Sequence, residues 1–544
     1  MEPESRGIFL FHEQTKHHFH RFARSAGYMD WGNQPDPFRA FSGTRRIPLP
    51  LLDKDPEAGH LDLYGRENNR QRPMTLGNIA AFLELSLGLS AWKTIPGNRW
   101  SLRMNPSSGN LHPTECYLIL PGGNASESGG VYHYNPLAHA LEVRAEFGEE
   151  TWKAIRDYFR CEGFLVGLSS IFWRESWKYG ERAFRYCNHD VGHALAALSF
   201  SANLQGWKVN YLNSLSDEQV ETVLGYDRTQ WHDLEAEAPE ALCFVCANSV
   251  ESTPGSLPRE IVSAFAKIPF HGSPNPLSAN RVRWEVIDSV QSASRKPETI
   301  ERRFSYGRKG FREESPSPLG AARIIRSRRS ALAFDEEGFL TKEQFLSMLD
   351  KTIPRDGRAP FDIQLGEPCV NLLIFVHNVN GLDRGLYFYF RSGEKVEAMS
   401  HVSDPAFLWD RVEAGEPLYL LRRGDFRYIA ARVSCDQEIA GLGVFSLGMI
   451  AGFKEIIEKE PYRYRHLFWE TGMIGQVLYL EAVAHGVRGT GIGCFFDDPV
   501  HDILGLRDNR HQSLYHFAMG LPIEDPRLMT LPPYAHREIP ASEG

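Results

Sequence analysis

Small and apolar positions recur at helical spacing in two stretches of the chain, residues 190–207 and 470–487. The two stretches align without gaps at a shift of 280, and each ends at a glycine, as helices commonly do. Apolar runs at 241–247 and 514–519 follow them and predict buried strands. The pattern therefore predicts two copies of a unit that mixes helices with a few strands.

A second pair of segments repeats at a shift of 255. A polar loop in the first copy, Pro106–Asn110, has the sequence Pro-Ser-Ser-Gly-Asn and is called the serine loop below. In the second copy its place is taken by Phe361–Leu365, which has no serine. The flanking proline, glycine and two tyrosines are kept: Pro113, Gly130, Tyr132 and Tyr134 correspond to Pro368, Gly385, Tyr387 and Tyr389. The fold is thus repeated, while the polar loop is not.

These repeats suggest how the 544 residues are organised. A chain of this length suits two domains of about 200 to 250 residues better than a single core. We expect an N-terminal extension at 1–70, a first domain at 71–250, a linker rich in Ser, Pro and Arg at 251–318, and a second domain at 319–544. The predicted fold class is α+β, with the two domains forming an intramolecular pseudo-dimer.

Composition excludes several classes of protein. The chain is 42% hydrophobic and 24% charged with a net charge of −9, which argues against a general nucleic-acid binder. No stretch approaches the roughly 18 unbroken apolar residues of a membrane span. The N-terminus lacks the basic and apolar regions of a secretion signal. Eight scattered cysteines do not form a disulfide framework, so we expect a cytoplasmic protein.

Two segments carry a resemblance to a known family. The serine loop with the following Leu111–Pro113 resembles the flavin-contacting loop of the nitroreductase family. Residues 173–186, together with Asp190–His193, resemble the SagB-type dehydrogenase branch of that family, which includes oxidases that aromatise azolines in modified peptides. The resemblance covers most of residues 75–247 and 321–522. It implies two nitroreductase-like domains in tandem, with FMN as the cofactor.

In that family FMN lies between two subunits, and each subunit contributes different parts of the site. The parts that resemble the phosphate segment and the glycine turn beside the flavin N5 lie in the second half of this chain, whereas the serine loop lies in the first. Because the parts are complementary, we expect one composite FMN site per chain and a degenerate mirror site. The residues assigned to cofactor binding are Pro106, Ser107, Ser108, Asn110, Arg326, Ser327, Arg328, Gly491, Ile492 and Gly493.

The chemistry of these residue types agrees with the assignment. Guanidinium groups bind a phosphate bidentately, and glycines let backbone N–H groups approach a ring without a Cβ in the way. Serines and Asn110 in a tight loop can hydrogen-bond the polar edge of a flavin. The same segments are also compatible with a solvated arginine cluster, a plain helix-to-strand turn and an ordinary loop.

Lys178 and Tyr179 are the candidates for catalysis. In azoline-oxidising relatives a Lys-Tyr pair in this motif is implicated in removing the substrate proton while N5 of FMN takes the hydride. A lysine serves as a base only where burial or a neighbouring cation lowers its pKa. Three arginines close in sequence could supply that field: Arg174, Arg182 and Arg185. The alternative is that Lys178 forms a solvated ion pair with Glu175 or Glu181.

Histidines and cysteines give no metal prediction. His189 and His193 have the i, i+4 spacing of metal ligands but no further ligand cluster, so we expect packed helix residues. Cys243 and Cys246 lie in a predicted buried strand without a second cysteine pair. The histidines near the N-terminus are expected to be exposed: His12, His17, His18 and His20.

The sequence therefore favours an FMN-dependent oxidoreductase that dehydrogenates a peptide-derived or small biosynthetic substrate. Its expected electron partner is NAD(P)H or oxygen, and neither nucleic acid nor membrane is an expected partner. A pseudo-dimer of this kind would be a monomer. Two alternatives stay open: an NAD(P)H-dependent nitro or quinone reductase, and a non-catalytic pseudo-dimer that binds flavin or peptide.

Overall fold

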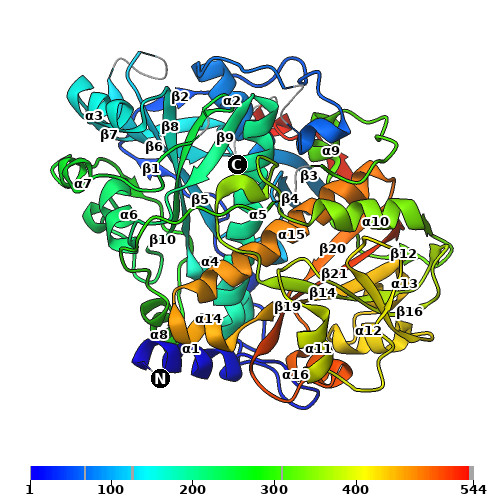
Figure 1. The fold of residues 1–544 in the computed structure, drawn as a ribbon. Coiled ribbons are helices and arrows are strands. Elements are labelled where there is room, and N and C mark those ends of the chain that lie inside the picture. Colours follow the sequence, from blue (N-terminus) through cyan, green and yellow to red (C-terminus); the bar gives the residue numbers. More distant parts are fainter. Residues whose placement is uncertain (1, 66–68, 124–127, 251, 308–309, 538–544) are drawn as a thin grey trace.

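A computed structural model describes residues 2–65, 69–123, 128–250, 252–307 and 310–537. Two antiparallel sheets form its two halves, and two long helices run between them (Figure 1). The first half, blue to green, lies on the left of the view, and the second half, yellow to red, lies on the right. The predicted α+β class is confirmed.

The first sheet has seven strands in the order β2-β7-β6-β5-β8-β10-β9. Their neighbours are all antiparallel, and the central strands are buried along their whole length. The strands span Arg46–Pro48 (β2), Thr114–Leu120 (β5), Gly129–Asn135 (β6), Ala140–Phe147 (β7), Gly163–Ser170 (β8), Trp207–Tyr211 (β9) and Ala238–Ala247 (β10).

The second sheet has eight strands in the order β12-β21-β19-β14-β16-β18-β17, with β20 also paired to β21. They span Phe334–Asp335 (β12), Val370–Val376 (β14), Gly385–Tyr389 (β16), Asp410–Arg411 (β17), Leu418–Arg423 (β18), Phe445–Gly452 (β19), Arg488–Ile492 (β20) and His511–Pro522 (β21). The run β18-β16-β14-β19-β21-β20 repeats the order β7-β6-β5-β8-β10-β9 of the first sheet. The two halves therefore share one topology.

Three small sheets tie distant parts of the chain together. The C-terminal strand β22 (Met529–Leu531) pairs with β3 (Leu89–Ile95), which forms a hairpin with β4 (Asn98–Arg103). Strand β1 (Phe41–Ser42) pairs with β11 (Ser273–Pro274), and β13 (Leu340–Thr341) with β15 (Val379–Asn380). The first of these sheets carries the C-terminal segment onto the first half.

Sixteen α-helices are found among the described residues. They are Pro3–Gln14 (α1), Leu76–Ser86 (α2), Glu149–Phe159 (α3), Phe172–Tyr179 (α4), Ala183–Leu204 (α5), Asp217–Leu224 (α6), Arg259–Phe265 (α7), Glu285–Ala293 (α8), Ala321–Ser327 (α9), Lys342–Lys351 (α10), Val396–Val402 (α11), Arg427–Val433 (α12), Ile439–Leu442 (α13), Lys454–Lys459 (α14), Arg463–Ala484 (α15) and Asp497–Leu504 (α16).

The two predicted helices are α5 and α15, and each begins seven residues before the predicted start. They cross where two glycines meet. A Cβ at Gly192 would lie 2.1 Å from the Trp469 carbonyl oxygen, and one at Gly472 would lie 2.2 Å from the His189 carbonyl oxygen. Since Gly192 and Gly472 are counterparts at the shift of 280, the crossing point lies on the pseudo-two-fold axis of the repeat.

The N-terminal extension is packed more tightly than the sequence suggests. His12 and His17 are buried, so the expectation that both are exposed is wrong. The Arg185 guanidinium donates to the His12 carbonyl oxygen at 2.6 Å, and the His17 amide donates to Asp497 at 3.0 Å. The extension therefore joins α5 to α16 from the outside.

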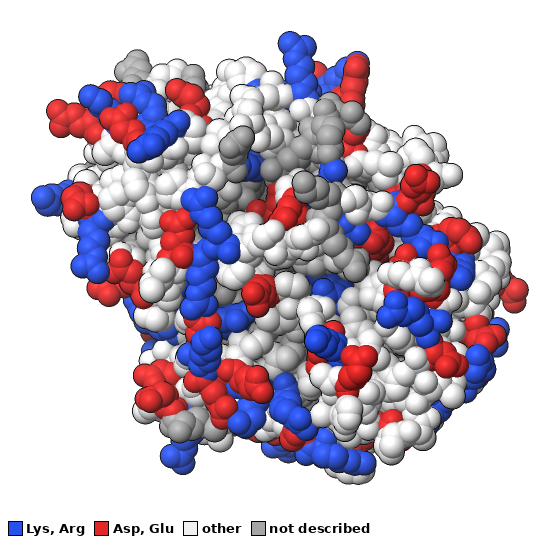
Figure 2. Space-filling view, viewed as in Figure 1, with Lys and Arg blue, Asp and Glu red and all other residues white. Residues whose placement is uncertain are grey.

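The surface is mixed in charge. On the face shown in Figure 2, basic and acidic side chains alternate, without a broad area of one sign. Among the described residues, none of the helices is both long enough and apolar enough to cross a bilayer.

Candidate functional site

A cavity of about 470 Å³ lies between the two halves. Its volume falls in the range of about 300–1,000 Å³ that is usual for small-molecule sites. The first half contributes the serine loop, Tyr179 from α4, and Tyr186, Asp190 and His193 from α5; the second half contributes residues 328–332, Tyr479 from α15, and residues 488–494. The predicted complementary parts thus meet at one place, which is called the composite cavity below.

The serine loop is held by its own chain. The Ser108 amide donates to the Asp190 carboxylate at 3.1 Å, and the Ser107 hydroxyl accepts from the His112 amide at 2.8 Å. The Asn110 side-chain amide donates to the Ser101 carbonyl oxygen at 2.9 Å. The sequence analysis assigned these polar groups to the flavin edge. The structure shows instead that they fix the loop and hold a carboxylate.

The same loop touches the predicted catalytic pair. Gly109 has a φ of 59°, a left-handed conformation that glycine adopts without strain. A Cβ there would lie 2.6 Å from the Tyr179 hydroxyl and 3.2 Å from the Lys178 ammonium nitrogen. The Tyr179 ring also contacts the Tyr186 ring edge-on, with centroids 4.6 Å apart. Tyr179 and the serine loop are therefore neighbours at one wall of the cavity, and Lys178 lies beside them without lining it.

Two carboxyl groups near this wall lack a cationic partner. Burial raises the pKa of Asp190 to about 7, against hydrogen bonds from Ser107 and Ser108 that lower it. Burial, reinforced by the negative Asp190, raises the pKa of Glu175 well above its ordinary value. Neither Glu175 oxygen finds a hydrogen-bond partner among the described residues. Asp190 is thus a carboxyl that can take up or release a proton near neutral pH.

Another part of the cavity lining is cationic and is called the cationic end below. Arg328, Arg329 and Arg488 lie there with Lys93 of β3. The first two donate to backbone carbonyl oxygens, Arg328 to Met104 and Arg329 to Ser90, both at 3.0 Å. Burial, with the neighbouring Arg328 and Arg488, lowers the pKa of Arg329 to about 9. Among the described residues, the carboxylate paired with this group is Glu524, 2.7 Å from Arg488. The excess positive charge suits an anionic ligand group.

Arg326 and Ser327 are not part of the cavity lining. The Arg326 guanidinium is paired with Glu84 at 2.6 Å and with Asp55 at 3.1 Å. Two carboxylates already neutralise it, so Arg326 is not a phosphate ligand here. The phosphate segment assigned from the sequence therefore moves two to three residues toward the C-terminus. The positions at the cavity are Arg328, Arg329 and Ser330.

Gly491, Ile492 and Gly493 do line the cavity, but not as a turn. Gly489–Ile492 belong to strand β20, and the Gly491 amide donates to the Tyr479 hydroxyl at 2.8 Å. A Cβ at Gly491 would lie 1.9 Å from the Tyr515 hydroxyl, and one at Gly493 would lie 2.3 Å from the Tyr186 ring. Glycine is needed because two tyrosines of the protein pack against the strand.

The three arginines expected to act on Lys178 are all paired with carboxylates elsewhere. Arg174 pairs with Glu115, and Arg182 and Arg185 both pair with Asp497, at 3.0 and 2.7 Å. Within the described part of the chain, no ion pair with Glu175 or Glu181 is found for Lys178 either; Glu181 pairs with Arg24 at 3.3 Å. Lys178 is half-buried beside Gly109.

His189 and His193 are buried packing residues. The His189 ring stacks on Tyr515 with centroids 4.1 Å apart, and its Nε2 lies 3.0 Å from the Leu514 carbonyl oxygen. The His193 Nε2 lies 3.3 Å from the Tyr515 hydroxyl. Both rings therefore hold α5 against β21.

The position that mirrors the serine loop is nearly filled. The cavity beside Phe361 and Leu365 measures about 20 Å³, and one next to it, lined by Lys296 and Arg302, measures about 250 Å³. A wider groove of about 910 Å³, which shares Tyr306 and Pro368 with the first cavity, lies outside it. The first has room for little more than a water molecule. The second falls below the usual range for a cofactor site.

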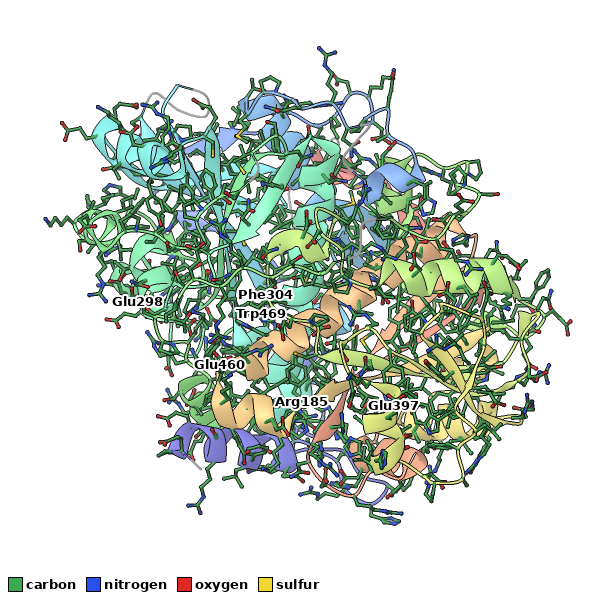
Figure 3. All side chains as sticks on the ribbon, viewed as in Figure 1. Arg185, Glu298, Phe304, Glu397, Glu460 and Trp469 are labelled. Carbon is green, nitrogen blue, oxygen red and sulfur yellow. The ribbon has the colours of Figure 1, made fainter. Side chains whose placement is uncertain are left out.

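Residues 296–306 of the predicted linker close this mirror position. The Phe304 amide donates to the Gln364 side chain at 2.7 Å, and the Tyr306 hydroxyl donates to the Gly366 carbonyl oxygen at 3.1 Å. Arg302 pairs with Glu460 at 2.8 Å. Phe304 and Glu460 are both labelled in Figure 3. The linker therefore covers a site rather than only connecting two units.

Several lining residues were missed by the sequence analysis: Asp190, Tyr186, Arg329, Ser330, Tyr479, Arg488 and Cys494. Asp190 carried a usable signal, because its counterpart at the shift of 280 is another acid, Glu470. Arg329 and Ser330 directly follow the predicted phosphate segment. The others depend on contacts between helices and strands far apart in sequence.

Comparison with known proteins agrees with this geometry. Residues 67–235 match the nitroreductase family. The trifolitoxin-processing protein TfxB of Rhizobium leguminosarum bv. trifolii is 30% identical over 131 residues, which cover 22% of this chain and 35% of that protein. A nitroreductase-like protein of Methanocaldococcus jannaschii is 24% identical over 159 residues, covering 28% of this chain and 75% of that one. The chain thus spans about a third of the length of the first of these relatives.

One solved structure matches almost the whole chain. It is a crystal structure described as a nitroreductase of Anabaena variabilis, with a TM-score of 0.69 and 22% sequence identity, covering 96% of this chain and all of the other. This match shows the fold. Together with the family match it confirms the predicted nitroreductase relation.

Proposed function

We propose that this chain, which carries a nitroreductase-family domain in its first half and a nitroreductase fold over nearly its whole length, is an FMN-dependent dehydrogenase with one active site, the composite cavity. The observation that carries the proposal is that one cavity contains both a cationic end and a wall of groups that can exchange protons. The first suits a phosphate and the second suits a redox reaction that releases a proton.

The residues present fit FMN. Strand β20 runs from Arg488 to Ile492, and a rise of about 3.3 Å per residue separates Arg488 from Gly493 by roughly 16 Å. A phosphate beside Arg328, Arg329 and Arg488 and a planar ring beside the tyrosines would then lie at opposite ends of the cavity. The buried Asn105 Oδ1 and His112 Nδ1 have no partner among the described residues and remain available to a ligand.

FMN, when bound, supplies the hydride acceptor. The protein's own part is to bind substrate at the tyrosine wall and to take the substrate proton. Burial holds the pKa of Tyr179 well above its ordinary value, so this hydroxyl stays protonated and donates a hydrogen bond. Asp190, with its pKa near neutrality, is a group close to this wall that can accept a proton. Lys178 lies next to Tyr179 at Gly109.

The substrate class that we propose is peptide-derived. The support is the similarity, over 131 residues, to a protein named for trifolitoxin processing. Oxygen reoxidises the reduced flavin in this proposal, and NAD(P)H is the alternative electron partner, as a donor that reduces the flavin. The cytoplasm remains the proposed location.

The proposal is tested at the cationic end. Arg328→Gln and Arg488→Gln should weaken FMN binding by about 10- to 100-fold, since a charge-assisted hydrogen bond contributes about 1.5–3 kcal/mol. Riboflavin, which lacks the phosphate, should bind wild type and variants equally. Quenching of flavin fluorescence measures both affinities.

Arg326→Gln is the matched control, because Arg326 is paired with Glu84 and Asp55 outside the cavity. It should leave the ratio of FMN to riboflavin affinity unchanged. Equal loss of FMN affinity in all three variants, or no loss in any, would contradict the placement of the phosphate.

A further inference from the structure

Two cysteines meet at the edge of the composite cavity. Cys494 follows Gly493 and lines the cavity, and Cys435 lies in the loop after α12. Their sulfur atoms are 2.7 Å apart. A disulfide bond is about 2.05 Å long, so an approach of well under 1 Å would join them. The pair comes from segments 59 residues apart and is brought together only by the fold.

The backbone holds this approach in place. Cys435 and Asp436 both have left-handed φ angles, 57° and 56°, which residues other than glycine seldom adopt. The Gln437 side chain donates to the Ser434 carbonyl oxygen at 2.8 Å and to the Cys494 carbonyl oxygen at 3.1 Å. The loop is thereby fastened to the segment after β20 that carries the second cysteine.

The two sulfurs are not equivalent. The hydrogen bond with Cys435 lowers the pKa of Cys494. A hydrogen bond with His17 and the positive charge of Arg182 lower it further, whereas burial raises it. The hydrogen bond between the two sulfurs raises the pKa of Cys435. His17 Nδ1 accepts from the Ala23 amide at 2.9 Å, which leaves Nε2–H to donate. Cys494 is therefore the thiolate and Cys435 the thiol of the pair.

Three other cysteines show the opposite environment. Burial raises the pKa of Cys116, Cys187 and Cys243. Among the described residues, no neighbouring group lowers these pKa values enough to offset the effect of burial. Such thiols are chemically inert. Cys494 differs from these three by lining the composite cavity and by its cationic surroundings, and Cys435 lies 2.7 Å from it.

We propose that Cys435 and Cys494 form a reversible disulfide that exchanges two electrons with a flavin in the composite cavity. The protein then holds a second two-electron centre beside its cofactor. This inference rests on the proposed function, because it needs a flavin in that cavity.

The exchange balances as follows. Formation of the S–S bond removes the S–H proton of Cys435 and two electrons from the Cys435 thiol and the Cys494 thiolate. Oxidised flavin takes up both electrons and one proton and becomes the anionic reduced form. In the reverse direction the reduced flavin gives up the same two electrons and proton, the S–S bond breaks, and one thiol and one thiolate are regenerated.

The test is an anaerobic dithionite titration of the FMN-loaded protein, combined with thiol counting under denaturing conditions. Wild type should take up four electrons per flavin and gain two thiols on reduction. Cys435→Ser should take up two electrons and gain none. Mass spectrometry of the oxidised wild type should show a Cys435–Cys494 cross-linked peptide that reduction removes.

Cys369→Ser, at a half-buried cysteine outside the cavity lining, is the control and should behave as wild type. A yellow wild-type protein that takes up only two electrons per flavin, with no change in its thiol count, overturns the inference and leaves the proposed function intact. A protein that binds no flavin overturns the proposed function itself. Melting curves of both variants show whether each is folded.

Discussion

At the scale of single residues, a comparison of Asp190 with its counterpart Glu470 shows how the two halves diverged. Glu470 pairs with Arg391 at 2.8 Å and accepts from the Cys369 amide at 2.9 Å. Among the described residues, Asp190 has no cationic partner and is held by the serine loop. A buried carboxylate that is paired with a cation stays ionised, whereas the pKa of one without a cation is raised toward neutrality. Only the first half therefore keeps an acid suited to proton transfer.

This difference predicts a pH dependence of stability. The folded-state pKa of Asp190 is raised to about 7 from an unfolded value near 3.9, so the folded protein binds more protons between these values. Stability is then lost as the pH rises through this window, by about 2–3 kcal/mol from pH 5 to pH 7, and is flat above it. The Asp190→Asn variant does not lose this stability. Its melting temperature should therefore rise relative to that of wild type as the pH increases from 5 to 8.

Thermal melting at several pH values measures this effect. Glu336→Gln, at an exposed acid, should follow wild type at every pH. A constant difference between Asp190→Asn and wild type from pH 5 to pH 8 would show that Asp190 does not titrate in this window.

A second prediction concerns the Lys178–Tyr179 pair. Lys178→Ala should slow the reduction of bound flavin by substrate at least 100-fold, as expected for loss of a group that handles the proton. FMN should stay bound, because Lys178 lies at the serine loop and not at the cationic end. Stopped-flow absorbance measures the reduction rate. The control Lys153→Ala, at an exposed lysine of α3, should keep the wild-type rate, and a Lys178→Ala rate within twofold of wild type would remove Lys178 from the mechanism.

At the scale of elements, the crossing of α5 and α15 sets the geometry of the composite cavity. The two helices contact each other at Gly192 and Gly472, where backbone meets backbone. From this crossing, α5 supplies Asp190 and Tyr186, while α15 supplies Tyr479. A change in the spacing of the helices would therefore move both walls of the cavity.

Gly192→Ala should test the crossing. The new methyl group would meet the Trp469 carbonyl oxygen at 2.1 Å, and overpacking of this kind costs about 1–3 kcal/mol. The melting temperature should fall by several degrees. Gly77→Ala makes the same substitution in helix α2, where a Cβ meets nothing within 4 Å, and should leave the melting temperature unchanged or raise it. Equal effects of the two variants would contradict a tight crossing.

The sequence predicted the elements better than the contacts. Periodicity located α5 and α15, and the repeat placed the serine loop and β20 in one site. It could not show that Arg326 is neutralised by Glu84, because that acid lies 242 positions earlier in the chain. Nor could it show that the glycines of β20 accommodate Tyr515 and Tyr186. Local pattern fixes local structure, and the partners of a charged side chain depend on the tertiary fold.

At the scale of the whole molecule, the structure is a pseudo-dimer whose two equivalent positions differ in size, and we propose that only the larger one binds the cofactor. The composite cavity measures about 470 Å³, while the mirror position beside Phe361 measures about 20 Å³. Residues 296–306 run over the mirror position and bond to it through Gln364 and Gly366. The segment that connects the halves therefore also helps to fill the mirror position.

The number of flavins per chain tests this account most directly. Protein saturated with FMN and freed of excess ligand is denatured, and the released flavin is measured by absorbance against protein from amino-acid analysis. The account predicts one FMN per 544-residue chain, held in the composite cavity. Two FMN per chain would show that the mirror position also binds the cofactor and would contradict the account.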